Sequence, residues 1–145
     1  MDYSAIVDIL APCGLNCSRC AEYQNGEIKQ SSEKLLALLG NYQRIATIKE
    51  KANSAFTAYQ QFLELLNIFA QGPCGGCRSA ENYCPVNCAA KTCHREKGVD
   101  FCFQCSVFPC DKPIPLGERW LKMNERMREI GVEQFFAEQS KLPRY

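Results

Sequence analysis

The middle of the chain carries a long repeat of apolar residues at helical spacing. Between residues 35 and 69 these residues recur at steps of three and four, which places them on one face of an α-helix. The repeat consists of Leu35, Leu38, Leu39, Tyr42, Ile45, Ile48, Ala52, Phe56, Tyr59, Leu63, Leu66 and Phe69. Residues 31–33, Ser-Ser-Glu, precede it and predict an N-terminal cap. We therefore predict helices whose apolar side chains form core rather than a cofactor-binding face.

Glycines divide this repeat. Gly40 predicts a break between a short first helix and a long second one, and Gly72, which Pro73 follows, predicts the end of the second. An unbroken helix over residues 43–70 would be about 40 Å long at 1.5 Å per residue. That length is large for a chain of 145 residues, so a kink or a split in this helix is an open alternative.

A second helical pattern follows the last cysteine. Pro113 and Pro115 introduce it, and Gly131 separates one helix from a final short one. Its apolar positions are Leu116, Trp120, Met123, Met127, Ile130, Val132, Phe135 and Phe136. No segment alternates as a strand does, so we predict a mainly α fold with at most short β hairpins. We expect residues 1–145 to form a single domain with a helical core.

The composition is dominated by eleven cysteines. Residues 1–10 contain two acids and no basic residue, so they do not resemble a secretory signal, and we expect a cytoplasmic protein. Disulfides do not persist in a reducing cytosol, and an odd number of cysteines fits poorly with a fully paired framework. Metal binding is therefore the predicted use of these thiols. No apolar run approaches the ~20 residues of a membrane span, which argues against a membrane role.

Eight cysteines are concentrated between residues 74 and 110. They are Cys74, Cys77, Cys84, Cys88, Cys93, Cys102, Cys105 and Cys110. A Cys-x-x-Cys turn brings two sulfur atoms to one metal, and two such turns 24 residues apart are close to the pattern of a structural zinc site. Gly75 and Gly76 suit the first turn by permitting positive φ.

Eight thiols suffice for two tetrahedral sites, and the sequence leaves their pairing open. An interleaved arrangement groups the two Cys-x-x-Cys pairs, and a sequential one separates the first four cysteines from the last four. We expect residues 74–110 to form a metal-stapled loop lobe that packs with the cysteine group at 13–20.

That group consists of Cys13, Cys17 and Cys20. Its spacing is the one that radical S-adenosylmethionine enzymes use to hold an iron–sulfur cluster, but no strand precedes it and no βα repetition follows. Three thiols leave a tetrahedron incomplete, so the fourth ligand comes from the distal block or the site keeps an open position. His94 is the single histidine and would be a twelfth ligand, while the alternative is a solvated histidine beside Cys93.

These motifs together resemble a family of small cysteine-rich proteins of bacteria and archaea, known as a domain of unknown function and presumed to bind zinc. The resemblance rests on residues 11–20 (APCGLNCSRC), on the CGGC sequence at 74–77 and on the run from 93 to 110. It covers roughly residues 10–112 and implies a metal-binding role without a reaction. The chain departs from the family at Ala21, where proline is common, and at His94, where a small or aliphatic residue is usual.

The function that we expect is a zinc module whose two or three ions stabilise the fold, so that a surface can recognise a protein partner. No serine–histidine–acid set, phosphate loop or HExxH sequence is present, and we name no catalytic residue. An iron–sulfur protein that uses the Cys13, Cys17 and Cys20 triplet is the alternative. Thiol redox chemistry or metal buffering is a further alternative, which the apolar core and the absence of a βαβ setting disfavour.

Nucleic-acid binding is a fourth possible class of function. Five basic residues near the cysteines are its candidates: Arg78, Lys91, Arg95, Lys97 and Lys112. The chain has no lysine or arginine run, its formal net charge is only +1, and two tetrathiolate zinc centres would make the metal-loaded protein mildly acidic. We therefore expect these bases to offset thiolate charge rather than to bind DNA or RNA.

Overall fold

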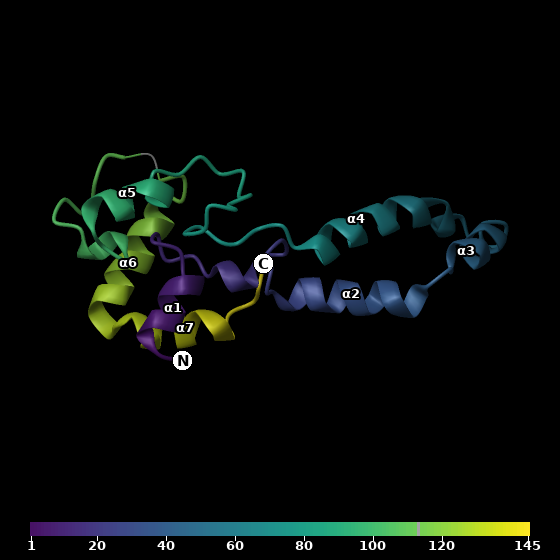
Figure 1. The fold of residues 1–145 in the computed structure, drawn as a ribbon, viewed down its shortest axis with the longest axis horizontal. Helices are drawn as coiled ribbons and strands as arrows, with labels where there is room; N and C mark the ends of the chain where they lie inside the picture. Colours follow the sequence, from purple (N-terminus) through teal and green to yellow (C-terminus); the bar gives the residue numbers. More distant parts are fainter. Residues whose placement is uncertain (113) are drawn as a thin grey trace. The chain divides into compact units, whose positions relative to one another are not determined.

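A computed structural model of the chain describes residues 1–112 and 114–145 and has seven α-helices in that part (Figure 1). The helices are α1 (Tyr3–Ile9), α2 (Glu27–Leu39), α3 (Gln43–Lys49), α4 (Tyr59–Gln71), α5 (Ala90–Lys97), α6 (Glu118–Ile130) and α7 (Val132–Lys141). Short 3-10 turns are η1 (Cys17–Arg19), η2 (Ser54–Ala58) and η3 (Cys102–Gln104). Within the described residues, β pairing is confined to an isolated bridge between Leu10 and Asn16. The prediction of a mainly α fold is confirmed.

The chain divides into two compact units. The first joins residues 1–19 to residues 74–145, and the second consists of residues 20–73. We call the first the cysteine unit, since it contains every cysteine except Cys20, and the second the hairpin unit. The expectation of a single domain stays a prediction. None of the described helices combines the length and the apolar character that crossing a bilayer requires.

The core of the cysteine unit lies where α1, α6 and α7 meet. Its buried members are Ile6, Leu10, Phe101, Met123, Met127, Val132 and Phe135. The predicted helix after the last cysteine is therefore present, and it begins at Glu118. Gly131, at φ 84°, lets the chain turn from α6 into α7, as the sequence predicts. Pro113, which was expected to introduce this helix, lies outside the described residues.

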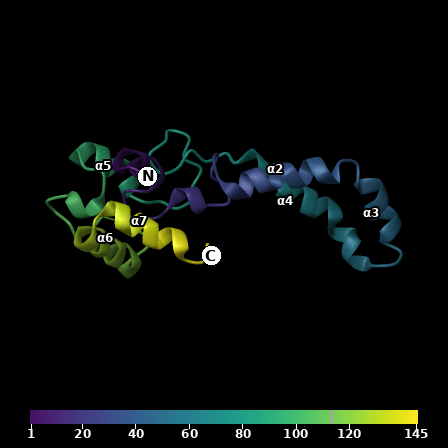
Figure 2. The ribbon, with the colours of Figure 1, turned by 90° about the horizontal axis from the view of Figure 1, so that it is seen from below.

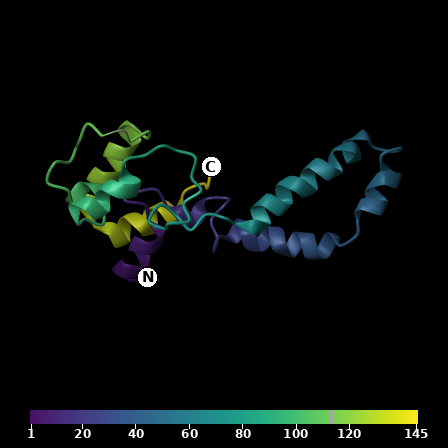
Figure 3. The ribbon, with the colours of Figure 1, turned by 45° about the horizontal axis from the view of Figure 1, so that its top comes forward.

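The hairpin unit is built on α2 and α4, which run antiparallel and side by side in the views of Figure 1, Figure 2 and Figure 3. The helix α3 and the turn η2 connect their far ends. Gly40 follows α2 and Gly72 follows α4, both with φ of 49°, so both predicted helix ends are confirmed. Ser32 and Leu66 are buried along the helix pair.

One local prediction in the hairpin unit is wrong, and one open alternative is decided. The helix α2 begins at Glu27, and Ser32, expected at the cap, is buried inside it because helical spacing continues backwards through Ile28. The helix is interrupted near Asn53, although the apolar repeat continues through this point. The side chain of Asn53 accepts a hydrogen bond of 3.0 Å from the main-chain N–H of Ala55 and starts η2. Of the two alternatives for residues 43–70, the structure contains the split helix.

Candidate metal centre

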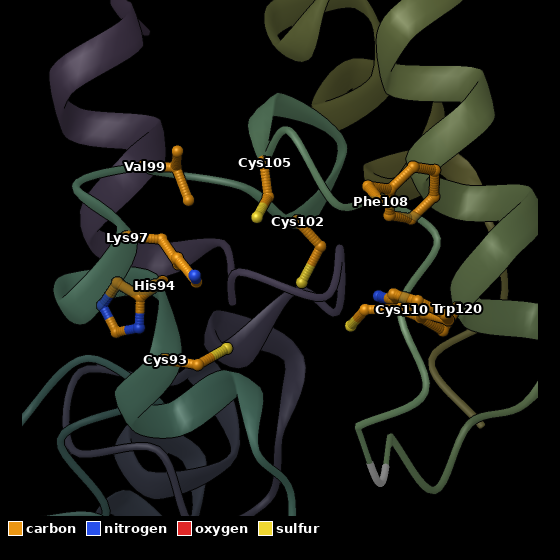
Figure 4. Close-up of a pocket in the computed structure, with 9 residues that line it drawn as sticks. All are labelled: Cys93, His94, Lys97, Val99, Cys102, Cys105, Phe108, Cys110 and Trp120. Carbon is orange, nitrogen blue, oxygen red and sulfur yellow. The ribbon is translucent and has the colours of Figure 1, made fainter.

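Four cysteines of the cysteine unit surround one small cavity, and we call them the C-terminal cluster. They are Cys93, Cys102, Cys105 and Cys110. Figure 4 shows their thiol groups pointing toward a common space from α5, from η3 with the residue after it, and from the chain beyond. The cavity has a volume of about 20 Å³, which is room for about one water-sized particle. Its other lining residues are His94, Lys97, Val99, Phe108 and Trp120.

Backbone hydrogen bonds form the turn that presents two of these thiols. The N–H of Cys105 donates to the carbonyl of Cys102 at 3.1 Å, and the N–H of Phe108 donates to that of Cys105 at 3.1 Å. The N–H of Cys102 donates to the carbonyl of Pro12 at 2.9 Å, which ties this turn to the loop that carries Cys13. The fully buried ring of Phe101 precedes the turn and anchors it in the core. The Cys-x-x-Cys geometry expected from the sequence therefore has a rigid support.

Trp120 on α6 borders the same cavity. Its ring packs edge-on against Phe108, with ring centroids 5.1 Å apart. Its indole N–H is buried and has no hydrogen-bond partner among the described residues. A buried N–H without a partner is costly, and a thiolate in the cavity would satisfy it. Helical spacing predicts that Trp120 belongs to the core, and no signal in the sequence indicates its second position beside the thiols.

Two thiols of the C-terminal cluster, those of Cys93 and Cys102, have pKa values above the usual range of a cysteine. Burial raises the pKa of Cys102 to about 11; the neighbouring indole N–H of Trp120 opposes this shift without forming a hydrogen bond, and repulsion from other thiols adds to it. Burial also raises the pKa of Cys93, while the ammonium of Lys112 lowers it. A metal ion that binds here must displace protons, as thiolate sites do in general.

A second concentration of thiols, which we call the N-terminal cluster, centres on Cys13, Cys17 and Cys77. The side chains of Cys17 and Cys77 share a hydrogen bond, which lowers the pKa of Cys17 and raises that of Cys77. Burial raises the pKa of Cys13 to about 12, and repulsion from Cys77 and Cys88 adds to this. The charge of Cys74 also acts on Cys17. The structure thus brings two thiols of the proximal triplet close to the distal block.

Glycines shape the two turns of the N-terminal cluster in different ways. Gly14 has φ of 97°, and a Cβ there would lie 3.0 Å from the Cβ of Met123, so the loop after Cys13 packs directly on α6. Gly76 has the positive φ, 92°, that the sequence led us to expect. Gly75 is not among the glycines of positive φ, but a Cβ there would lie 2.5 Å from Oγ of Ser79. Gly75 is therefore required because the side chain of Ser79 lies close to its Cα, and not because of its φ.

The basic residues near the cysteines bind the chain itself. Arg78 donates to the carbonyl of Leu10 at 3.2 Å and to that of Asp100, and its guanidinium lies 5.2 Å from the ring centroid of Phe101. Lys91 donates to the carbonyl of Cys84 at 2.7 Å. Arg95 donates to the carbonyl of Arg78, and Lys112 forms an ion pair with Glu96. These contacts give Arg78, Lys91, Arg95 and Lys112 structural roles within the chain, and the expectation that the protein does not bind nucleic acid stays a prediction.

Two further candidate ligands from the sequence, His94 and Cys20, have different surroundings. His94 is buried beside the cavity, and its Nδ1 lies 2.8 Å from the carbonyl oxygen of Ala90, which can only accept. Burial lowers the pKa of its imidazole, which favours the neutral ring. Cys20 is exposed and begins the hairpin unit. Its expected role as a ligand, like that of His94, stays a prediction.

The thiols of each cluster lie near one another, but they are not close enough together to coordinate an ion. In the described part of the chain, no group of three or more Cys, His, Asp or Glu side chains lies close enough together to hold one. The C-terminal cluster contains the last four cysteines, as in the sequential arrangement. The first Cys-x-x-Cys pair of the interleaved arrangement does not line that cavity.

Fold and site together define a mainly helical protein whose thiols gather in two clusters on one unit. The chain belongs to the family described as "Protein of unknown function (DUF3795)", whose sequence pattern matches residues 9–114. The matched segment contains all eleven cysteines and ends before α6 begins. No curated protein matches the chain, and no solved structure does.

Proposed function

We propose that this protein binds metal through cysteine thiolates and that the C-terminal cluster is its principal centre. The observation that carries this proposal is the convergence of four thiols on one cavity of about 20 Å³. A set of four thiolates selects zinc or iron–sulfur clusters among the metals common in proteins. The small cavity favours a single ion, and zinc is the ion that we propose.

The surroundings of the cluster fit such an ion. Four thiolates around a divalent cation leave a net charge of about minus two. The side chain of Lys97 lines the cavity, and Lys112 lies close enough to act on Cys93. The unpartnered indole N–H of Trp120 supplies a donor to a sulfur atom. Cations and N–H donors beside thiolates offset this charge and orient the ligands.

We propose a second centre at the N-terminal cluster. The hydrogen bond between Cys17 and Cys77 brings together one thiol from each region of the sequence, and Cys13 and Cys74 act electrostatically on Cys17. These four thiols would supply the four ligands of one tetrahedral site, with Cys84 and Cys88 as neighbouring thiols. The ions stabilise the cysteine unit and leave its surface available to a protein partner. This role requires no reaction.

The test is metal analysis followed by a titration that reports on one cluster. Protein purified without oxygen should contain about two equivalents of zinc and should be colourless. The metal-free protein titrated with Co²⁺ should develop the absorption of tetrahedral cobalt thiolate. Trp120 is the single tryptophan, so its fluorescence should change as the C-terminal cluster fills.

Two cysteine variants test whether the change in Trp120 fluorescence comes from the C-terminal cluster. Cys105→Ser should remove the fluorescence response, and Cys20→Ser, which changes an exposed thiol outside the C-terminal cluster, should keep it. A folded protein that contains no metal and takes up no Co²⁺ would contradict the proposal. Iron and labile sulfide in place of zinc would assign the centre to an iron–sulfur cluster, the alternative expected from the sequence.

A further inference from the structure

The hairpin unit exposes more large apolar side chains than it buries. Its buried apolar residues are Tyr23, Ala46, Tyr59 and Leu66. Its exposed ones are Leu35, Leu38, Ile45, Ile48, Phe62, Leu65 and Ile68. Leu38 is 74% exposed and Leu65 is 56% exposed, values typical of polar residues on a helix surface. Two helices that pack only on each other cannot cover a second apolar face.

Four of the exposed residues lie on the same side of the helix pair. The contact line of α2 runs through Ser32 and that of α4 through Leu66. At about 100° per residue, Leu35 and Leu38 lie about 60° and 120° to one side of the α2 line. Counted in the same way, Phe62 and Leu65 lie about 40° and 100° to the same side of the α4 line.

The antiparallel arrangement makes these two sides coincide. In an antiparallel pair, rotation in one sense about each helix, viewed from its own N-terminus, leads to the same side of the pair. The residues of both helices therefore form one continuous surface, which we call the open face: Leu35, Leu38, Phe62 and Leu65. Along the described α2 and α4 this strip contains no charged position.

The opposite side of the hairpin is polar. Lys29 and Glu33 of α2 form an ion pair of 3.7 Å there, and Gln60 donates to Glu64 of α4 at 3.3 Å. Ala37 of α2 and Asn67 of α4 are exposed on this side as well. Each helix therefore has one apolar stripe that the other helix covers and a second apolar strip that is exposed. A further layer of structure is required to bury that second strip.

We propose that the open face binds the open face of a second copy of the chain, which closes a four-helix bundle. A two-fold axis in the plane of the contact sets each helix antiparallel to its new neighbour, the common arrangement of such bundles. Identical apolar, uncharged faces are complementary to one another, whereas a nucleic acid or an acidic peptide requires basic side chains that this face lacks.

Charge and size both permit this dimer. The hairpin unit has five acidic residues (Glu22, Glu27, Glu33, Glu50, Glu64) and five basic ones (Lys29, Lys34, Arg44, Lys49, Lys51), so two copies do not repel each other. Helices of 13 residues are about 20 Å long, and two of them side by side are about 20 Å across. The flat area of such a face is about 400 Å², below the ~800 Å² that each partner contributes to a standard interface, so the expected dimer is a weak one that dissociates on dilution.

Sedimentation velocity of the full chain, in the presence of a reductant that excludes disulfide cross-links, tests this proposal. The wild type should be a dimer that dissociates on dilution. Leu38→Glu and Leu65→Glu should each raise the dissociation constant by about 100-fold or more, because the carboxylate is buried in both symmetric copies. Ala37→Glu, one position away but on the polar side, should leave the constant unchanged, and Asn67→Glu is the matched control on α4.

Hydrogen exchange on the wild type makes the test independent of the folding of any variant. Backbone amides of α2 and α4 should lose protection on dilution, while those of α6 should not. A wild type that stays monomeric at every concentration would overturn the proposal. So would a dimer that the two open-face variants leave intact, since its contact would then lie elsewhere.

Discussion

The side-chain amide of Asn124 donates a hydrogen bond of 3.0 Å to the main-chain carbonyl of Cys13, a residue 111 positions earlier. The same nitrogen donates to the carbonyl of Trp120 at 3.0 Å, and the oxygen accepts from the N–H of Phe103 at 2.9 Å. Asn124 is fully buried. One polar side chain of α6 therefore fixes both the loop of the N-terminal cluster and the turn of the C-terminal cluster.

Asn124→Ala should lower the free energy of unfolding by about 3 kcal/mol, because it leaves the Phe103 N–H and the Cys13 carbonyl buried without partners. Urea unfolding of the metal-loaded protein measures this. Glu125→Ala, an exposed change on the same helix, should have almost no effect. Equal stability of the two variants would show that the hydrogen bonds of Asn124 are replaced by water.

Trp120→Phe should weaken metal binding at the C-terminal cluster by about tenfold, as the loss of a partner that orients a ligand commonly does. The change keeps an aromatic ring against Phe108 and removes only the indole N–H. Competition with a chelator measures the affinity. Unchanged affinity in a folded variant would mean that the indole does not donate to a bound thiolate.

Removal of metal under reducing conditions should loosen the cysteine unit and spare the hairpin unit. Exchange of backbone amides in α5 and η3 should become about 100-fold faster or more, since a bound ion stabilises the folded state by mass action. Amides of α2 and α4 at fixed protein concentration should keep their protection. Equal loss in both units would show that the ions stabilise the whole chain together.

The ion pair between α6 and α7 gives a prediction for acidic pH. Arg126 donates to both carboxylate oxygens of Glu138, at 2.7 and 3.2 Å, and these hydrogen bonds lower the pKa of that carboxylate. A carboxylate with a lowered folded pKa stabilises the fold above its unfolded pKa, and this contribution disappears as the pH falls through the folded value. The wild type should therefore lose more stability than Glu138→Gln below about pH 4.5.

Thermal unfolding across this pH range measures the difference. Arg126→Met supplies the control, because a carboxylate without its guanidinium should show the same weak dependence as the amide variant. The effect should shrink in high salt, since both side chains are solvent-accessible. A wild type and a Glu138→Gln variant with identical pH profiles would contradict the role of this pair.

The sequence predicted the helices that follow clear rules. Gly40, Gly72 and Gly131 end helices where the pattern places them, and Met123 and Met127 are buried at helical spacing. The helices α1 and α5 were not predicted. The first has only seven residues, and the second lies among the cysteines, where only two of its residues are buried and the apolar repeat is correspondingly weak.

The sequence predicts that the candidate site consists of cysteines, but it does not predict which cysteines lie together. Spacing identifies Cys-x-x-Cys turns, but it cannot tell which turns meet, because that depends on long-range contacts such as the hydrogen bond from Cys102 to Pro12. The whole hairpin unit lies between Cys17 and Cys77 in the sequence, so no local spacing predicts that these two thiols are in contact. The position of the Trp120 N–H depends on how α6 packs, and no local pattern reports it.

The hairpin unit separates Cys17 from Cys74 in the chain, and this order has a consequence for biosynthesis. A ribosome adds about 5–20 residues per second, so Cys13 and Cys17 emerge about 3–12 s before Cys77. During that interval the hairpin can already form, while the first two thiols have no partner from the distal block. If the N-terminal cluster holds a metal ion as proposed, its first two thiols would need to stay reduced and unbound until the second pair is made.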